Sequence, residues 1–348
     1  MNSILGEALA YDDILLVPSK SLKSRRTANT SSRLTKKVSL EVPIISANMD
    51  TVTESEMMNA MADFGALGAL HRNNTIQQEV EELKKHINYL QVIGKPDYPV
   101  AASVGVTEGH KERADELIKQ GASIIIIDIA HGYADSVADM IKYIKDKHSP
   151  IEIIAGNVAN GDAVEFLIEA GADCIKAGIG NGGLCSTRLV TGCGVPTITA
   201  LRNCVEVADQ YDIPIIADGS IRYGGDILKA FWAGAESVMV GGLFSATDES
   251  PGDIEVINGQ KYKEYRGMAS HKARQAIDTD HNDIAAEGVS THKPYKGSVK
   301  PILQELIGGF KSGMSYVSAD TTDKICRAKA YKMTGSGLQE SIPHGKVL

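Results

Sequence analysis

A cysteine in a glycine-rich loop is the residue of this sequence best suited to nucleophilic chemistry. Segment 182–188 reads GGLCSTR, so Cys185 has small and polar neighbours and lies three positions before Arg188. Backbone N–H groups and a nearby guanidinium favour the thiolate, which is the reactive form of cysteine. A lone cysteine is more often a small buried hydrophobe, but this polar loop favours a nucleophile. We expect structural roles for the other cysteines, Cys174, Cys193, Cys204 and Cys326.

Two aspartates come directly after apolar residues. Asp218 ends the segment IPIIAD, and Asp128 follows a run of isoleucines at 124–127. A carboxylate in such a position either caps a turn or accepts hydrogen bonds from ligand hydroxyls, such as those of a ribose. The residues alone leave both interpretations open.

Glycine-rich turns follow three of the apolar segments. They contain Gly182 with Gly183, Gly219 with Ser220, and Gly241 with Gly242. Such glycines could simply allow tight turns. Their joint placement after three successive segments favours a phosphate site instead, because backbone N–H groups in such turns bind anions.

The elements that must position these residues follow a repeating pattern. A Gly-Ala pair ends a helix-like stretch at 65–66, 121–122, 171–172 and 234–235, and an apolar run follows each pair. Glycine commonly ends a helix because it tolerates the left-handed conformation. Continuous apolar runs that alternate with amphipathic helices indicate a parallel sheet covered by helices. The predicted strands are 43–47, 66–70, 98–103, 123–127, 151–155, 173–177, 213–217 and 236–240.

Eight such units favour a closed (β/α)8 TIM barrel over an open, doubly wound sheet. In a barrel the carboxyl ends of the strands carry the site, which is where Cys185, Asp128 and Asp218 are expected. We predict one catalytic domain over 1–348, with long polar segments at 179–200 and 247–300. Within the second, Asn258-Gly259 indicates a hairpin, and 271–283 is expected to be mobile. The tail 325–348 is predicted to be loose or bound to a partner.

Composition excludes several classes of protein. With 348 residues, of which 43% are hydrophobic, the chain can bury a large core. The net charge of −8 argues against binding to nucleic acid or an acidic membrane. Five cysteines without paired spacing indicate a reducing compartment and exclude a zinc or disulfide framework, and the scattered histidines show no metal spacing. No secretory signal or membrane-spanning run is recognisable, so we expect a cytoplasmic protein.

Several ordered motifs resemble the IMP dehydrogenase/GMP reductase family over about residues 8 to 345. The motifs are YDDILL at 11–16, ANMDT at 47–51, GIG at 178–180, CSTR at 185–188, ADG at 217–219 and YRGM at 265–268. The resemblance implies a homotetrameric (β/α)8 barrel for purine nucleotides. It also implies a cysteine thiolate that adds to purine C2, where a nicotinamide cofactor exchanges a hydride.

Residue roles follow from the same resemblance. Cys185 would be the nucleophile, and Thr187 and Glu287 would assist the departure of ammonia. The nucleotide would be bound by Met49, Asp218, Gly219, Ser220, Gly241, Gly242, Tyr265, Gly267 and Met268. The nicotinamide nucleotide, NADPH or alternatively NADH, would be bound by Asp128, Asn157 and Arg72. Potassium would be bound by Gly180, Gly182 and Cys185.

The flap at about 267–290 favours the reductase branch. Segment 267–287 lacks the Arg-Tyr pair with which dehydrogenases activate water, and it is short. Regulatory domains typical of dehydrogenases are absent from the sequence. Segments 294–297 (PYKG) and 339–341 (QES) resemble bacterial dehydrogenases instead. Asn181 and Gly183 stand where the family usually has proline and serine, so one phosphate donor is missing.

The sequence therefore predicts a GMP reductase that converts GMP to IMP and ammonia. Two alternatives stay open at this stage. One is an IMP dehydrogenase, which makes XMP from IMP with NAD, without regulatory domains. The other is a non-catalytic homologue that binds a purine nucleotide.

Overall fold

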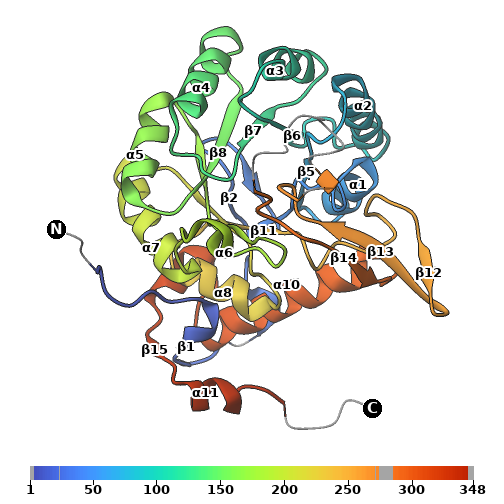
Figure 1. Ribbon diagram of the computed structural model, residues 1–348. Helices are drawn as coiled ribbons and strands as arrows, with labels where there is room; N and C mark the ends of the chain where they lie inside the picture. Colours follow the sequence, from blue (N-terminus) through green and yellow to red (C-terminus); the bar gives the residue numbers. More distant parts are fainter. Residues whose placement is uncertain (1–3, 23, 271, 274–284, 344–348) are drawn as a thin grey trace.

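Eight parallel strands form a closed barrel in the computed structural model, which describes residues 4–22, 24–270, 272–273 and 285–343 (Figure 1). Around the barrel the strands follow their chain order, and β11 pairs with β4 to close it. The predicted (β/α)8 fold is confirmed, because one barrel strand overlaps each predicted apolar run. The strands are β4 (Ile44–Ser46), β5 (Leu67–Leu70), β6 (Ala101–Val104), β7 (Ile124–Asp128), β8 (Glu152–Val158), β9 (Cys174–Ala177), β10 (Ile215–Asp218) and β11 (Ser237–Val240).

Helices surround the strands on the outside of the barrel (Figure 1). They are amphipathic, as the predicted helix within 107–120 illustrates: Ala114 and Leu117 are buried and the charged residues face outward. The predicted Gly-Ala ends are also present, since Gly171 ends one helix with a φ of 112°. The helices are α1 (Ser55–Asp63), α2 (Ile76–Val92), α3 (His110–Lys119), α4 (Asp135–Lys147), α5 (Gly161–Ala170), α7 (Thr197–Ala208), α8 (Gly224–Trp232) and α10 (Val299–Tyr316).

The apolar core has two layers because the strands are apolar on both faces. One cluster fills the inside of the barrel and includes Leu67, Ile126 and Met239. The larger cluster lies between the strands and the helices. The short hairpin β2 (Ser32–Arg33) and β3 (Ser39–Leu40) closes the amino-terminal end, where Leu34 and Leu40 join the inner cluster.

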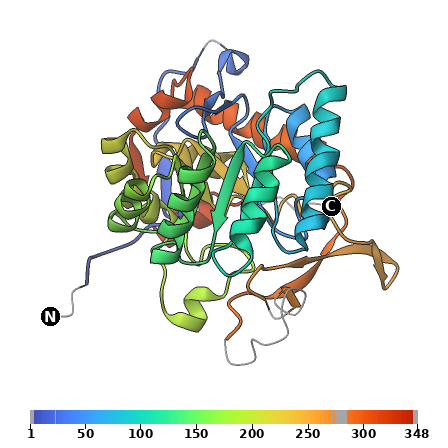
Figure 2. The ribbon, with the colours of Figure 1, turned by 90° about the horizontal axis from the view of Figure 1, so that it is seen from above.

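A three-stranded antiparallel sheet extends from the other end of the barrel (Figure 2). It contains β12 (Glu255–Ile257), β13 (Gln260–Arg266) and β14 (Ser290–Pro294). The predicted hairpin is present, with Asn258 and Gly259 both at positive φ between β12 and β13. Figure 2 shows the short helix α6 (Thr187–Thr191) at the same end. Of the stretch 271–283, expected to be mobile, only 272–273 lie within the described residues.

The tail differs from its prediction as a loose or partner-bound segment. Strand β15 (Ala330–Lys332) pairs antiparallel with β1 (Ile14–Leu16) of the same chain. The pairing satisfies backbone groups of a short edge strand whose Ile14 is buried in the core. Helix α11 (Gly335–Glu340) follows, and 344–348 lie outside the described residues. The remaining elements are the short helices η1 (Tyr11–Asp13), η2 (Arg25–Thr27), η3 (Asp209–Tyr211) and η4 (Thr322–Arg327).

Within the described ranges, no helix is long and apolar enough to cross a membrane.

Candidate active site

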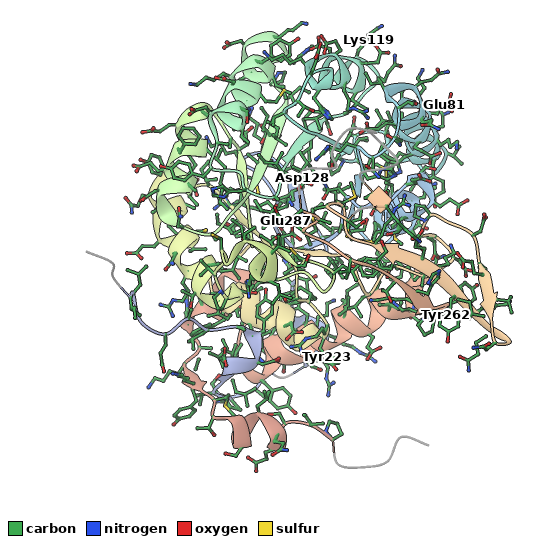
Figure 3. All side chains as sticks on the ribbon, in the orientation of Figure 1. Glu81, Lys119, Asp128, Tyr223, Tyr262 and Glu287 are labelled. Carbon is green, nitrogen blue, oxygen red and sulfur yellow. The ribbon has the colours of Figure 1, made fainter. Side chains whose placement is uncertain are left out.

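A cavity of about 650 Å³ opens among the loops that follow the barrel strands. Its size suits a small-molecule ligand. In Figure 3, the labelled Asp128 and Glu287, which both line the cavity, lie near the middle of the barrel. Most predicted site residues line it: Met49, Arg72, Asp128, Asn157, Gly180, Gly182, Cys185, Thr187, Asp218, Gly219, Tyr265, Gly267, Met268 and Glu287.

The predicted nucleophile belongs to a chain of three polar side chains. Cys185 is exposed, and its Sγ lies 3.1 Å from Thr187 Oγ1. The Thr187 hydroxyl donates to Glu287 Oε2 at 2.8 Å, although 100 positions separate the two residues in the sequence. Each member can therefore pass a proton to the next. The structure brings together the three residues that the sequence singled out as catalytic.

Backbone hydrogen bonds fix this arrangement. Ser186 N donates to Glu287 O at 2.9 Å, and Val289 N donates to Leu184 O at 3.0 Å. These bonds join the cysteine loop to the segment that precedes β14. The positions of the thiol and the carboxylate therefore depend on each other.

Arg188 differs from its expected position beside the thiol. Its guanidinium donates to Ile179 O at 3.2 and 3.1 Å and to Val195 O at 2.6 Å. A Cβ at Gly180, which has a φ of 73°, would lie 2.5 Å from Arg188 Cγ. Arg188 thus holds the ends of its own loop together, because unpaired loop carbonyls need donors.

Lys176, which was not among the predicted site residues, is almost completely buried and lines the cavity. Its Nζ lies 2.7 Å from Asp128 Oδ1 and 2.7 Å from Asp218 Oδ2, and it also bonds Asn157 Oδ1. Burial lowers the pKa of Lys176, but the two carboxylates outweigh it and hold the pKa above its usual value. The signal was a lone lysine within the apolar strand CIKA, where a charge requires partners.

Lys176 thereby connects the two aspartates predicted to bind different ligands. Burial raises the pKa of Asp128, and the cations Lys176 and Arg72 lower it to a net value below the usual range. Asn157 Nδ2 donates to Asp218 Oδ2 at 2.9 Å. Both aspartates therefore take part in a charged network rather than capping isolated turns, and hydroxyl groups of a ligand would meet carboxylates that are already oriented.

The residues expected to hold a nicotinamide nucleotide fit such a group. Arg72 lines the cavity, and its buried Nε has no hydrogen-bond partner among the described residues. Asp128 and Asn157 line the same cavity. A buried donor without a partner is costly, so a polar ligand would satisfy it.

The predicted phosphate turns follow β10 and β11. Ser220, Gly241 and Gly242 do not line the cavity but border it. A Cβ on Gly241 would lie 3.1 Å from Met49 Sδ and 3.3 Å from the Tyr265 hydroxyl, so a side chain there would be tightly packed. None of the described residues accepts a hydrogen bond from the N–H groups of Ser220, Gly241 or Gly242. These N–H groups are available to an anion.

Tyr265 adds a hydroxyl beside these turns. Burial and then Asp218 raise its pKa to about 12, so the phenol keeps its proton and can donate a hydrogen bond. Asn181, which departs from the family pattern, donates to Asp218 O at 2.7 Å and to Thr197 Oγ1 at 3.1 Å. Its amide therefore supports the loop. At Gly183, an added Cβ would meet nothing within 4 Å, so this position offers only backbone to a ligand.

The other cysteines divide into two groups. Cys174 and Cys204 are buried, and burial raises both thiol pKa values, that of Cys204 to about 12. Cys193 and Cys326 are exposed, because Cys193 follows the short helix α6 and Cys326 lies within η4 at the surface. Over the described part of the chain, no cluster of His, Cys, Asp or Glu could hold a metal ion. The potassium ligands Gly180, Gly182 and Cys185 stay a prediction.

Known proteins resemble this chain over nearly its full length. Residues 8–344 match the family described as IMP dehydrogenase / GMP reductase domain. Inosine-5'-monophosphate dehydrogenase of Borreliella burgdorferi is 38% identical, with 99% of this chain and 98% of the relative covered. The enzyme of the same name from Cryptosporidium parvum is also 38% identical, with 98% and 96% covered.

A solved structure resembles the fold. It is GMP reductase of Trypanosoma brucei, a cysteine-to-alanine variant in complex with guanosine 5'-monophosphate. Its TM-score is 0.92 at 30% identity, and 99% of each chain is covered. The relatives thus carry two different enzyme names on one fold. With its closed barrel, its cavity at the strand ends and these matches, the chain belongs to the IMP dehydrogenase/GMP reductase family, whose members are oxidoreductases acting on purine nucleotides.

Proposed function

We propose that the protein is a GMP reductase. The overall reaction consumes GMP, NADPH and two protons and yields IMP, NADP⁺ and ammonium. The hydrogen-bonded chain from Cys185 through Thr187 to Glu287 is the observation that carries this proposal. Reductive deamination needs a thiolate nucleophile and a proton for the departing amine. Ionisation of the Cys185 thiol supplies both, because its proton can pass through Thr187 to Glu287.

The proton balance follows from the contacts. The Cys185 thiol gives its proton through Thr187 to Glu287, and the thiolate forms a bond to purine C2. Glu287 then protonates the amino group as the C2–N bond breaks, and ammonia leaves. A reduced nicotinamide cofactor, when bound, supplies the hydride that C2 accepts. The C2–S bond then breaks, and two protons from solvent restore the thiol and convert ammonia to ammonium.

The remaining side chains would position the two nucleotides. Asp218 would accept hydrogen bonds from the ribose of GMP, while Met49, Gly267 and Met268 would contact the purine. Arg72, Asp128 and Asn157 would bind the nicotinamide nucleotide, for which NADPH is proposed and NADH is the alternative. Lys176 lies between the two sets, and its ammonium forms ion pairs with both aspartates.

We also infer, from the family resemblance, a cytoplasmic homotetramer built from one catalytic domain per chain. Potassium activation is proposed on the resemblance alone.

An IMP dehydrogenase is the second candidate, because the curated relatives at 38% identity carry that name. Hydrolysis of a cysteine–purine adduct requires activated water. The chain has no Arg-Tyr pair between 267 and 287 for this purpose. The Thr187–Glu287 pair does not separate the two candidates, since a carboxylate that accepts a hydroxyl can serve either reaction; the missing Arg-Tyr pair is what favours the reductase.

Two reactions with the full chain distinguish the candidates. GMP with NADPH should give IMP and ammonium in equal amounts, measured by mass spectrometry and an ammonium assay. IMP with NAD should give little XMP, with or without potassium. Ordinary turnover of IMP to XMP without consumption of GMP would refute the reductase. No turnover of either nucleotide would favour the non-catalytic homologue.

A further inference from the structure

A lysine that none of the roles above includes lies beside the predicted phosphate turns. Lys293 is on β14, and its Nζ donates to Gly242 O at 2.8 Å. The ammonium also lies 4.6 Å from the centre of the Tyr265 ring. A Cβ on Gly242 would approach Lys293 Nζ to 3.0 Å and the Tyr265 hydroxyl to 3.4 Å. The ammonium, the phenol and the open N–H of Gly242 are therefore neighbours.

A second lysine shows what a purely structural cation looks like at this place. Lys296 Nζ donates to three carbonyl oxygens, those of Gly242, Leu243 and Ser245, at 3.2, 2.8 and 3.0 Å. An ammonium group has three N–H donors, so Lys296 is saturated by the turn that it supports. Lys293 makes one such bond and keeps two donors for another partner.

The two cations lack a negative partner. Across the described residues, no carboxylate lies within ion-pair distance of Lys293 or Lys296. Burial lowers the pKa of Lys293, and burial together with Lys293 lowers the pKa of Lys296 to about 8. Lys293 is partly buried and Lys296 is exposed, and adjacent cations without an anion are unfavourable.

The opposite side of the site provides no charge to such an anion. Gly183 contributes no side chain, and the Arg188 guanidinium is bound to loop carbonyls. Positive charge for an anion at these turns can therefore come from β14.

We propose that Lys293 is the cationic partner of the 5'-phosphate of the bound purine nucleotide. This inference rests on the proposed nucleotide site but not on the reaction carried out there. Two ammonium N–H groups and the N–H groups of Gly241 and Gly242 bind the phosphate oxygens, with the Tyr265 hydroxyl beside them. The lysine therefore contributes to binding of a phosphate monoester dianion and contributes nothing to binding of the corresponding nucleoside.

Calorimetric binding to the full chain tests the proposal without requiring turnover. Lys293→Met should weaken GMP and IMP binding about 10- to 100-fold, the range for a hydrogen bond to a charged group. Guanosine and inosine should bind equally to both proteins. Lys293→Arg should recover most of the affinity. Lys261→Met is the matched control, because Lys261 is exposed on the same sheet and its side chain makes a cation–π contact with Tyr295 but no hydrogen bond or ion pair with any other described residue.

Two results would overturn the inference. One is unchanged GMP affinity in Lys293→Met. The other is an equal loss for GMP and guanosine, which would mean that the lysine only supports the sheet. If Lys293→Met does not fold, Lys293→Gln replaces it. Inorganic phosphate should raise the melting temperature of the wild type, and this increase must be absent in Lys293→Gln.

The outcomes also separate this inference from the reductase proposal. Binding of both nucleotides through Lys293 without reduction of GMP would refute the reductase and leave the phosphate contact standing. Reduction of GMP by Lys293→Met with an unchanged KM would refute the phosphate contact and leave the reductase proposal standing.

Discussion

Replacing Lys176 by methionine tests the charged network beneath the cavity. The ammonium is within 2.7 Å of both Asp128 and Asp218, and its side chain is 3% exposed. Methionine preserves most of the volume but leaves two neighbouring carboxylates without their shared cation. Removing one partner of a buried ion pair costs about 3 to 5 kcal/mol. We expect the free energy of unfolding to fall by this amount at neutral pH.

This cost converts to a measurable change in melting temperature. An unfolding entropy of about 2.1 cal/mol/K per residue gives about 0.7 kcal/mol/K for 348 residues. The variant should therefore melt about 4 to 7 °C below the wild type in differential scanning calorimetry at one scan rate. Lys119→Met is the control, because Lys119 is 72% exposed in its pair with Glu116 and should cost under about 1 kcal/mol.

The pH dependence provides a sharper test. Burial raises the pKa of Asp128, and Lys176 and then Arg72 bring it below the usual value. In the wild type, its stabilising contribution is present above the unfolded pKa of about 3.9 and is lost as pH falls through the native value. Without Lys176, burial dominates, and the native carboxylate pKa rises above the unfolded one. Protonation of Asp128 then stabilises the folded variant. The difference in free energy of unfolding between wild type and variant should therefore become smaller as pH falls from about 8 to about 5.

Two results would refute this reasoning. A decrease below about 1 °C at pH 8 would mean that water or backbone groups compensate the carboxylates. A deficit that stays constant as pH falls would mean that the loss of packing, and not of charge, destabilises the variant, because packing does not titrate. Adding Asp128→Asn to Lys176→Met should recover part of the loss, because one uncompensated charge disappears.

Three further outcomes are expected. Cys185→Ala should abolish turnover of GMP while calorimetry still detects nucleotide binding, and retained turnover would exclude a cysteine adduct. Glu287→Gln should lower kcat about 100- to 10,000-fold with little change in KM, as steady-state assays can show, because the amide cannot deliver a proton; a change confined to KM would contradict this role. Burial lowers the pKa of His86 to about 4, so the unfolded state binds more protons between about pH 4 and 6.5 and stability should fall as pH falls through this window. In His86→Gln the slope of melting temperature against pH should be smaller there, and an unchanged slope would assign the acid sensitivity to other groups.

The barrel could be predicted because its determinants are local. Eight continuous apolar runs separated by amphipathic helices bury both faces of a parallel sheet in only a few ways. The same order placed Asp128, Asp218 and Cys185 at one end of the barrel, since all parallel strands end on the same side. The hairpin at Asn258-Gly259 was also local, as this dipeptide favours positive φ at both residues.

Contacts between distant segments were decided only by the tertiary structure. Thr187 and Glu287 are hydrogen bonded across 100 positions, and family resemblance, not spacing, pointed to Glu287. Arg188 contacts carbonyl groups of its loop because the folded loop exposes them, a geometry that the letters CSTR do not contain.

The charge partners of the site depended on the fold in the same way. Lys176 of β9 meets Asp218 of the adjacent β10 and Asp128 of β7, which lies two strands away, because the closed barrel brings these strand ends together. Lys293 reaches Gly242 because β14 folds back over the strand ends. The sequence by itself determined which elements form and which ends carry polar residues, since both depend on local patterns of burial. Which charges meet was decided by packing, because an ion pair depends on distance in space and not on separation along the chain.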